Sequence, residues 1–314
     1  MSRMRSLTLT GALLAATAVT TAACGAGGNA ADDSKPTVMA AFYPLQWISQ
    51  RVGGPDVSVT GLTKPGTEPH DLELTARQVA DIQDSSLVVY IKGVQPAVDE
   101  AVQGHASGKA FDAAGAVSTL PATAEDEGHD EHDGHEHADV SYDPHIWLDP
   151  SRFAAVATQL GERLAAADPA HAAAYRQRAA DTAAELNKVD ESYRTGLATC
   201  GKKAIVTSHA AFGYLADRYG LEQISVSGID PDAEPSPTRL AQVADVAKRK
   251  NVTTIFTEEL VSPKVAEILA KEVGAATAVL NPLESEPDGG DYLSAAKLNL
   301  DVLRKALECP TTEG

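Results

Sequence analysis

Basic residues are scarce in this chain. Its 314 residues contain 26 Lys and Arg against 44 Asp and Glu, a formal net charge of −18 at pH 7. A chain this acidic is repelled by phosphate-rich surfaces, so nucleic acid and anionic membrane surfaces are excluded as preferred partners. The same charge attracts cations in general, but it does not by itself indicate a specific cation site.

Long apolar runs are absent after residue 23, so no later segment predicts a membrane span. Residues 1–23 have a basic start, an apolar run and small residues at the end, as a secretory signal peptide does. Cys24 follows two alanines, which resembles a bacterial lipobox, although Thr21 stands where Leu is usual. We expect cleavage before Cys24 and lipidation of its side chain; an ordinary signal with an incidental Cys is the alternative.

A tether is predicted after the cleavage site. Residues 24–35 are small and polar, cannot build a core and suit a flexible link between a lipid and a folded domain. Without the leader's two arginines the chain carries 24 basic and 44 acidic residues, a formal charge of −20. The expected location is extracytoplasmic, on the outer face of the cell membrane and held there by the lipid.

Cysteine is also rare. Once Cys24 is set aside, Cys200 and Cys309 remain. An even pair in an exported protein predicts a disulfide. A metal site built on these two thiols is disfavoured because neither has a Cys or His neighbour.

Apolar strands alternate with helical patterns along most of the chain. Continuous apolar runs such as residues 87–91 are typical of strands buried in a parallel sheet, and the alternation predicts an α/β fold. We expect two α/β lobes with parallel-rich sheets, residues 36–167 and 199–314, joined by one long rigid helix at 168–198. Its predicted apolar stripe, at spacings of three and four, consists of Tyr175, Ala179, Thr182, Leu186, Val189 and Tyr193.

An insertion within the first lobe has a different composition. Residues 121–139 contain eight acidic residues, no Lys or Arg and four histidines, namely His129, His132, His135 and His137. Without apolar periodicity, the segment is predicted to be disordered. Its imidazoles favour weak Zn²⁺ binding, and a solvated acidic loop without a role in transport is the alternative.

Polar residues follow several predicted strands, where open α/β sheets bind ligands. His70, His145, His209 and Asn281 lie in such loops. No CxxC or HExxH motif is present, so spacing alone does not establish a metal site. Taken singly, each histidine is better explained as a hydrogen-bonded loop residue.

Short sequence motifs surround these residues and follow one another in a fixed order along the chain. They are Glu-Pro-His-Asp-Leu-Glu-Leu (68–74), Asp-Pro-His-Ile-Trp-Leu-Asp-Pro (143–150), Ser-His-Ala-Ala-Phe-Gly-Tyr-Leu (208–215), Glu-Pro-Ser-Pro (234–237), Phe-Thr-Glu (256–258) and Leu-Asn-Pro-Leu (280–283). Together they resemble the ZnuA-like zinc/manganese solute-binding proteins of ABC importers, over about residues 36–309. The resemblance implies a metal in the cleft between the two lobes, bound by His70, His145 and His209, and delivery of that metal to a membrane permease.

The fourth ligand is left open. Many members of this family have Asp in a Leu-Asp-Pro-Leu motif, and here that position is Asn281. The fourth donor is Asn281, a water molecule, or a carboxylate such as Glu258 or Glu68. Three imidazoles favour Zn²⁺ over the harder Mn²⁺.

Two other functions fit part of the pattern. Three histidines and a water also form a catalytic zinc site, so a secreted zinc-dependent hydrolase is one alternative. The sequence shows no placed general base and no Ser or Cys nucleophile motif, and we expect no enzymatic activity. A zinc-buffering surface adhesin is the other alternative. We expect a monomer.

Overall fold

The structure is a computed structural model that describes residues 35–122 and 141–310. The predictions for the signal peptide, for Cys24, for the tether up to residue 34 and for the four histidines of the insertion lie outside these described residues. None of the described helices combines the length and the apolar character that crossing a membrane requires.

The described strands form two four-stranded sheets in which every pair is parallel. The first sheet has the order β2-β1-β3-β4 and the second β6-β5-β7-β8, so the two halves repeat one topology. The strands are β1 (Thr37–Ala40), β2 (Ser58–Gly61), β3 (Leu87–Tyr90), β4 (Ala110–Asp112), β5 (Ala204–Thr207), β6 (Glu222–Ser225), β7 (Thr254–Thr257) and β8 (Ala276–Val279).

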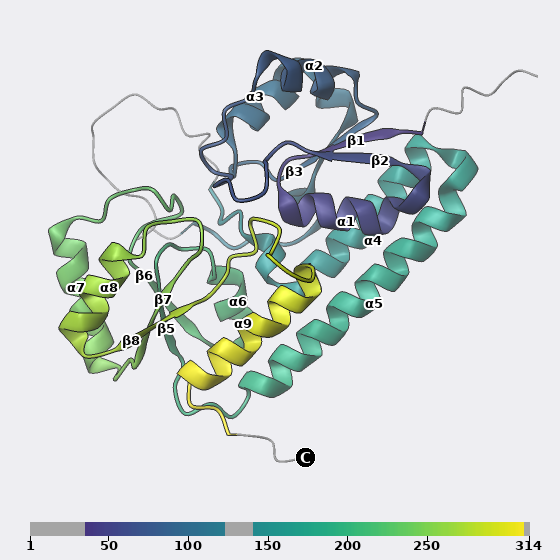
Figure 1. Ribbon diagram of the computed structural model, residues 1–314. Helices are drawn as coiled ribbons and strands as arrows, with labels where there is room; N and C mark the ends of the chain where they lie inside the picture. Colours follow the sequence, from purple (N-terminus) through teal and green to yellow (C-terminus); the bar gives the residue numbers. More distant parts are fainter. Residues whose placement is uncertain (1–34, 123–140, 311–314) are drawn as a thin grey trace, which may run out of the picture. The chain divides into compact units, whose positions relative to one another are not determined.

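Helices cover both faces of each sheet (Figure 1). In the first half α2 and α3 lie on one face and α1 and α4 on the other; in the second half α7 and α8 lie opposite α6 and α9. Their bounds are α1 (Tyr43–Gly53), α2 (Ala76–Asp84), α3 (Pro96–His105), α4 (Pro150–Ala167), α5 (Ala172–Leu197), α6 (Gly213–Tyr219), α7 (Pro237–Arg249), α8 (Lys264–Val273) and α9 (Tyr292–Ala306). The α/β prediction is confirmed.

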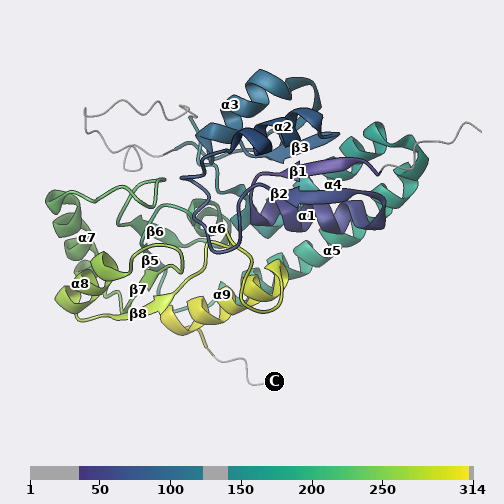
Figure 2. The ribbon, with the colours of Figure 1, turned by 45° about the horizontal axis from the view of Figure 1, so that its top comes forward.

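Helix α5 is the longest described helix and packs against both halves (Figures 1 and 2). At 1.5 Å per residue it is ~39 Å long. The predicted apolar stripe is confirmed, because all six of its residues are buried. The helix begins later than predicted, after a 3₁₀ turn at Pro169–His171, because the Asp168 carboxylate bonds His171 and Tyr175 and does not cap the helix.

The apolar core does not stop at the boundary between the halves. One cluster runs from β1 through α4 and α5 to Phe212, Phe256 and Leu303, and a smaller one lies between the second sheet and α7 and α8. From Lys35 onward the described residues therefore form one compact unit. The division into separate lobes at 36–167 and 199–314 stays a prediction.

The predicted disulfide is present between Cys200 and Cys309. It joins the segment after α5 to the segment after α9, where Lys202 N also donates to Leu307 O at 3.0 Å. The bridge closes a loop with a sequence separation of 109 residues. A cross-link over a loop this long restricts the unfolded chain strongly.

We expect the Cys200→Ser/Cys309→Ser variant to lose ~2–5 kcal/mol of unfolding free energy, because its unfolded state regains that freedom. Urea denaturation measures the loss. A reducing agent should bring the wild-type midpoint down to that of the variant and leave the variant unchanged. Equal midpoints for the oxidised wild type and the variant would contradict the expected stabilisation.

Candidate metal centre

Four side chains from distant parts of the chain converge on one point. His70, His145, His209 and Glu284 each offer one ligand atom, and these atoms all lie within 4.8 Å of one another. His70 lies between β2 and α2, and His145 directly precedes a 3₁₀ turn at Ile146–Leu148. His209 follows β5, and Glu284 lies between β8 and α9. Each half of the molecule therefore contributes two of the four donors.

The donor atoms lack hydrogen bonds. The Nε2 atoms of His70, His145 and His209 lie 3.5, 3.9 and 3.7 Å from Glu284 Oε1, beyond hydrogen-bond range. Among the described residues, none of the three nitrogens and neither oxygen of Glu284 has a hydrogen-bond partner, although all are buried. Buried polar atoms are seldom left in this state, so their convergence indicates a ligand.

The spacing fits a small divalent cation. Tetrahedral Zn²⁺ with ligands at ~2.0–2.1 Å has donor-to-donor edges of about 3.4 Å. The distances from Glu284 Oε1 to the three nitrogens, 3.5 to 3.9 Å, exceed that edge by a few tenths of an ångström, and all four donors lie within 4.8 Å of one another. His145, His209 and Glu284 are almost fully buried, whereas 8% of the His70 side chain is exposed. The donor group therefore lies nearest to solvent on the His70 side.

Two carboxylates contact two of the imidazoles at Nδ1, the ring nitrogen that does not face the other donors. Asp143 Oδ1 accepts from His145 N at 2.9 Å and lies 2.7 Å from His145 Nδ1. Glu258 accepts from His209 N through Oε1 at 3.2 Å and lies 2.7 Å from Nδ1 through Oε2. A proton on each Nδ1, shared with the carboxylate, leaves the Nε2 lone pair free for a metal.

Glu258 was one of the open choices for the fourth donor, and the structure places it outside the group of four. It follows β7 directly, and His209 follows β5, the neighbouring strand in the sheet. The carboxyl ends of these two strands bring Glu258 against the Nδ1 side of the ring, away from Nε2. Its role in this geometry is to orient His209.

Asn281 also lies outside the group of four. Its Oδ1 accepts from Leu283 N at 2.6 Å, and its Nδ2 donates to Glu259 Oε2 at 2.9 Å. Leu283 has φ of 60°, a left-handed conformation that costs a non-glycine residue roughly 1–2 kcal/mol. The turn held by the Asn281 side chain contains this strained residue and leads directly into Glu284.

Glu68, the remaining choice, lies at the edge of the group. Its Oε1 accepts from His70 N at 3.1 Å, and its Oε2 is buried without a hydrogen-bond partner among the described residues. Burial, together with the negative charge of Glu284, raises the pKa of Glu68 to about 7. Near neutral pH this carboxyl is therefore available in both protonation states beside His70.

Sequence reasoning missed Glu284. It directly follows the word Leu-Asn-Pro-Leu, and Glu286 lies two residues further on. The residue types do not distinguish the two glutamates, because both are the same amino acid on the same segment. They differ only in the folded chain, where the turn at Leu283 buries Glu284 and leaves Glu286 exposed. The position of a carboxylate directly after the Leu-Asn-Pro-Leu motif was the one feature of the sequence that could have indicated Glu284 as a ligand.

The carboxylates and imidazoles shift one another's protonation. Burial lowers the pKa of His209, but the negative charge of Glu258 and its hydrogen bond to the ring, together with the negative charge of Glu284, outweigh burial and raise the pKa well above its usual value. Burial lowers the pKa of His145, and the charges of the other two histidines lower it further against the opposing effect of Asp143. Burial raises the pKa of Glu284, but His209 and His70 lower it by more.

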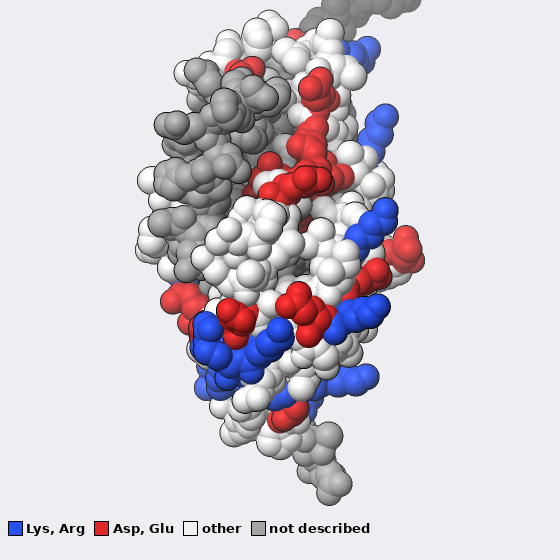
Figure 3. Space-filling view, turned by 90° about the vertical axis from the view of Figure 1, so that its left-hand side faces the viewer, with Lys and Arg blue, Asp and Glu red and all other residues white. Residues whose placement is uncertain are grey.

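Acidic side chains also gather outside the group. Asp71, next to His70 in the chain, faces Asp230 and Asp232 of the second half, and its bond with Asp232 and its burial raise its pKa to about 6. Figure 3 shows Asp and Glu side chains collected in the upper middle of the face it presents, with Lys and Arg mainly below and along one edge. Such an acidic surface raises the local concentration of cations.

Comparison with known proteins assigns the family. The family model described as "Zinc-uptake complex component A periplasmic" (ZnuA) matches residues 38–306. The chain belongs to this family. It is 35% identical over 309 residues to the "High-affinity zinc uptake system protein ZnuA" of Bacillus subtilis, a match that covers 94% of this chain and 96% of that protein.

Streptococcal relatives are also similar. The chain is 36% identical over 287 residues to "Zinc-binding lipoprotein AdcA" of Streptococcus pneumoniae, covering 88% of this chain but 56% of AdcA, so it spans about half of that relative. The Zn(II)-bound ZnuA-like domain of AdcA superposes with a TM-score of 0.72 at 34% identity, covering 87% of this chain and 99% of the domain. The laminin-binding protein Lmb of Streptococcus agalactiae, described as a bifunctional protein with adhesin and metal transporting activity, superposes with a TM-score of 0.77 at 32% identity, covering 87% of this chain and 99% of Lmb.

We expect His209 of the chelator-treated protein to stay protonated above pH 6.5, because Glu258 and Glu284 favour its charged form. A raised pKa contributes stability that is complete below the unfolded value and is lost as pH rises through the folded value. Nitrogen-15 NMR titration of the imidazoles measures this directly.

A matched pair of variants tests the cause. Glu258→Gln should lower the pKa of His209, and Glu259→Gln should leave it unchanged, because Glu259 bonds Asn281 instead. A wild-type His209 that titrates at or below pH 6.5 would contradict the assignment.

Proposed function

We propose that this protein captures Zn²⁺ outside the cytoplasm and delivers it to the permease of an ABC importer. The observation that carries the proposal is the convergence, in a buried group, of three imidazole nitrogens and the Glu284 carboxylate, none of which has a hydrogen-bond partner within residues 35–122 and 141–310. The family supports it, since the matching model describes a zinc-uptake component and relatives are named for zinc binding and zinc uptake.

His70, His145, His209 and Glu284 are the proposed ligands. Three imidazoles with one carboxylate suit Zn²⁺, and Mn²⁺ prefers a site richer in oxygen. Four protein donors also occupy all positions of a tetrahedral ion and leave none open for a reactive water. The same geometry thus favours capture over hydrolysis, and we propose that the protein is not an enzyme.

The proposed order of binding follows from a difference between the histidines, since two are held by carboxylates of the described residues and one is not. Asp143 and Glu258 hold His145 and His209 in place before the metal arrives. His70 lies on the solvent side, and the part of the chain that the structure describes places no carboxylate against its Nδ1, so it is the donor best able to move and close over the ion. Because the apolar core is shared between the halves, small shifts are favoured over a wide opening.

The surroundings of the folded domain complete the proposal. We propose that a lipid on Cys24 anchors the mature chain to the outer face of the membrane, supported by the lipoprotein name of AdcA. We propose that it acts as a monomer, and that the histidines of residues 121–139 collect Zn²⁺ weakly near the domain. Transport does not require them in this scheme.

Competitive titration of the mature chain with Zn²⁺ and Mn²⁺ tests the function. We expect one tight Zn²⁺ site, much weaker Mn²⁺ binding, and survival of the tight site when residues 123–140 are deleted. His70→Ala, His145→Ala, His209→Ala and Glu284→Ala should each weaken Zn²⁺ binding by more than the ~10–100-fold effect typical of residues behind a ligand.

Glu286→Ala is the matched control, because Glu286 is an exposed glutamate on the same segment. It should bind Zn²⁺ like the wild type. Wild-type affinity in all four ligand variants would rule out the site, and loss of tight binding on deletion of 123–140 would transfer it to the insertion. A preference for Mn²⁺ would contradict the metal assignment.

The turn before Glu284 generates a separate prediction. Asn281→Ala removes the acceptor that holds Leu283 N, so we expect about tenfold weaker Zn²⁺ binding through a displaced Glu284, equal to ~1.4 kcal/mol. Asn281→Asp combined with Glu259→Gln keeps an acceptor for Leu283 and should bind nearly as the wild type does. If Asn281→Ala binds as tightly as the wild type, the turn is not needed to place the ligand.

A further inference from the structure

Gly213 is the first residue of α6, and it lies directly against Asp143. A Cβ atom added at Gly213 would lie 2.5 Å from Asp143 Oδ2, a separation that real Cβ contacts essentially never show. The backbone of Gly213 is not left-handed, so its conformation does not require glycine. The close approach of the carboxylate is therefore the feature that a larger residue would disturb.

Asp143 has little freedom to move away. Its Oδ1 is held by both the backbone N and the Nδ1 of His145, and the residue is 6% exposed. Its backbone N donates to Leu120 O at 3.0 Å, and its backbone O accepts from the hydroxyl of Tyr214 at 2.5 Å. Tyr214 is the residue after Gly213, so the same end of α6 bonds the backbone of Asp143 and lies against its carboxylate.

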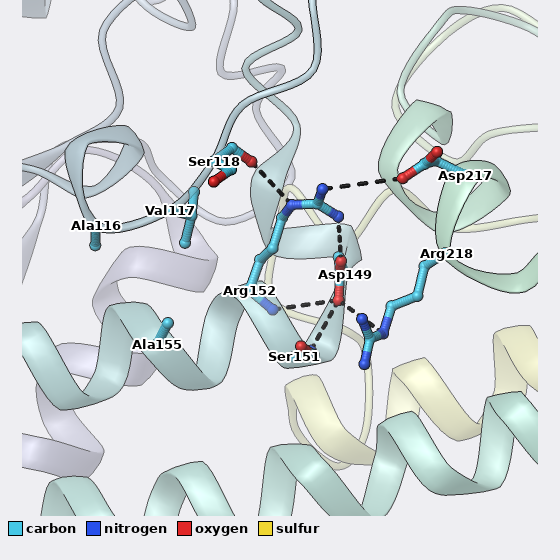
Figure 4. Close-up of a pocket in the computed structure, with 9 residues that line it drawn as sticks. All are labelled: Ala116, Val117, Ser118, Asp149, Ser151, Arg152, Ala155, Asp217 and Arg218. Atoms are coloured by element: carbon cyan, nitrogen blue, oxygen red, sulfur yellow. Dashed lines mark hydrogen bonds and ion pairs between the residues drawn. The ribbon is translucent and has the colours of Figure 1, made fainter.

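The other end of α6 is fastened to the same segment of chain. Figure 4 shows Arg152 and Arg218 approaching the buried carboxylate of Asp149 from two sides. Arg152 Nη1 lies 2.5 Å and Arg218 Nε 3.3 Å from this carboxylate. The Arg152 guanidinium also lies 4.8 Å from the centroid of the Tyr214 ring. Helix α6 is thus fixed against residues 143–152 at both ends and cannot retreat easily from Asp143.

We propose that Gly213 is a positioning residue for metal capture, which acts on His145 through Asp143. Its missing side chain lets α6 of the second half approach the carboxylate that orients His145 of the first half. The imidazole then keeps its proton on Nδ1 and presents Nε2 to the ion. This inference rests on the proposed function and extends it to a residue that touches neither the metal nor a ligand.

Gly213→Ala tests the proposal. Zn²⁺ affinity should fall ~10–100-fold, as it does when a residue behind a ligand is disturbed. Gly104→Ala is the matched control, because Gly104 also lies in a helix and an added Cβ there would meet nothing within 4 Å. The control should keep wild-type affinity. Wild-type affinity in Gly213→Ala would overturn the proposal.

A double-mutant cycle separates positioning from general damage. In an Asp143→Ala background the colliding carboxylate is gone, and the next atom near the new Cβ is Gln223 Oε1 at an ordinary 3.8 Å. Gly213→Ala should then have little further effect on Zn²⁺ affinity, and the double variant should fold even if Gly213→Ala alone does not. An equal loss in both backgrounds would show a general structural effect and overturn the proposal.

A metal-free measurement keeps the two hypotheses apart. In chelator-treated wild type, the His145 Nδ1 proton shared with Asp143 should give a downfield NMR signal that shifts or disappears in Gly213→Ala and persists in Gly104→Ala. If the signal changes in Gly213→Ala as expected but the wild type does not bind Zn²⁺, the proposed function is overturned and the positioning of His145 is supported. An unchanged signal in Gly213→Ala would overturn the positioning.

Discussion

The constraint on which the rest of this structure depends is the burial, at one point, of four donor groups that have no hydrogen-bond partner in the described part of the chain. Polar atoms removed from water without hydrogen bonds cost free energy, and here three imidazole nitrogens and a carboxylate face one another in that condition. Much of the surrounding structure maintains the arrangement. Asp143 and Glu258 orient two rings, and Leu283 adopts a strained conformation directly before Glu284. The apolar core that both halves share adds to these contacts in holding the four donors together.

Regular patterns in the sequence predicted the scaffold well. The alternation of strands and helices and the stripe of α5 depend on periodicity, which short stretches of sequence carry in full. The three histidines were selected by the words around them, and the structure brings all three together. The start of α5 was missed because Asp168 bonds His171 and Tyr175, a choice of partners that its sequence position does not reveal.

The features of the site that the sequence could not predict are those that depend on the backbone conformation of single residues. Asn281 and Glu284 are three residues apart, and either side chain is chemically able to bind a metal. A positive φ at Leu283 sends the glutamate inward while the amide holds the turn, and that dihedral angle has no signature in a leucine. Likewise Glu258 and Glu68 are both carboxylates near histidines, and only the geometry shows that each bonds the backbone of its neighbouring histidine and stays outside the group of four.

The shared core changes what release of an ion demands. Each half supplies two of the four donors, and the interface between the halves is packed with apolar side chains and crossed by hydrogen bonds such as that from Trp147 Nε1 to Pro282 O. Coordination distances in proteins tolerate changes of about 0.2 Å. If these four side chains hold the ion as proposed, a shift of one half past the other by about an ångström would therefore break two of the four coordination bonds at once. Release of the ion would then depend on a small displacement at the interface between the halves. It would not require the halves to open widely, as a hinge motion does.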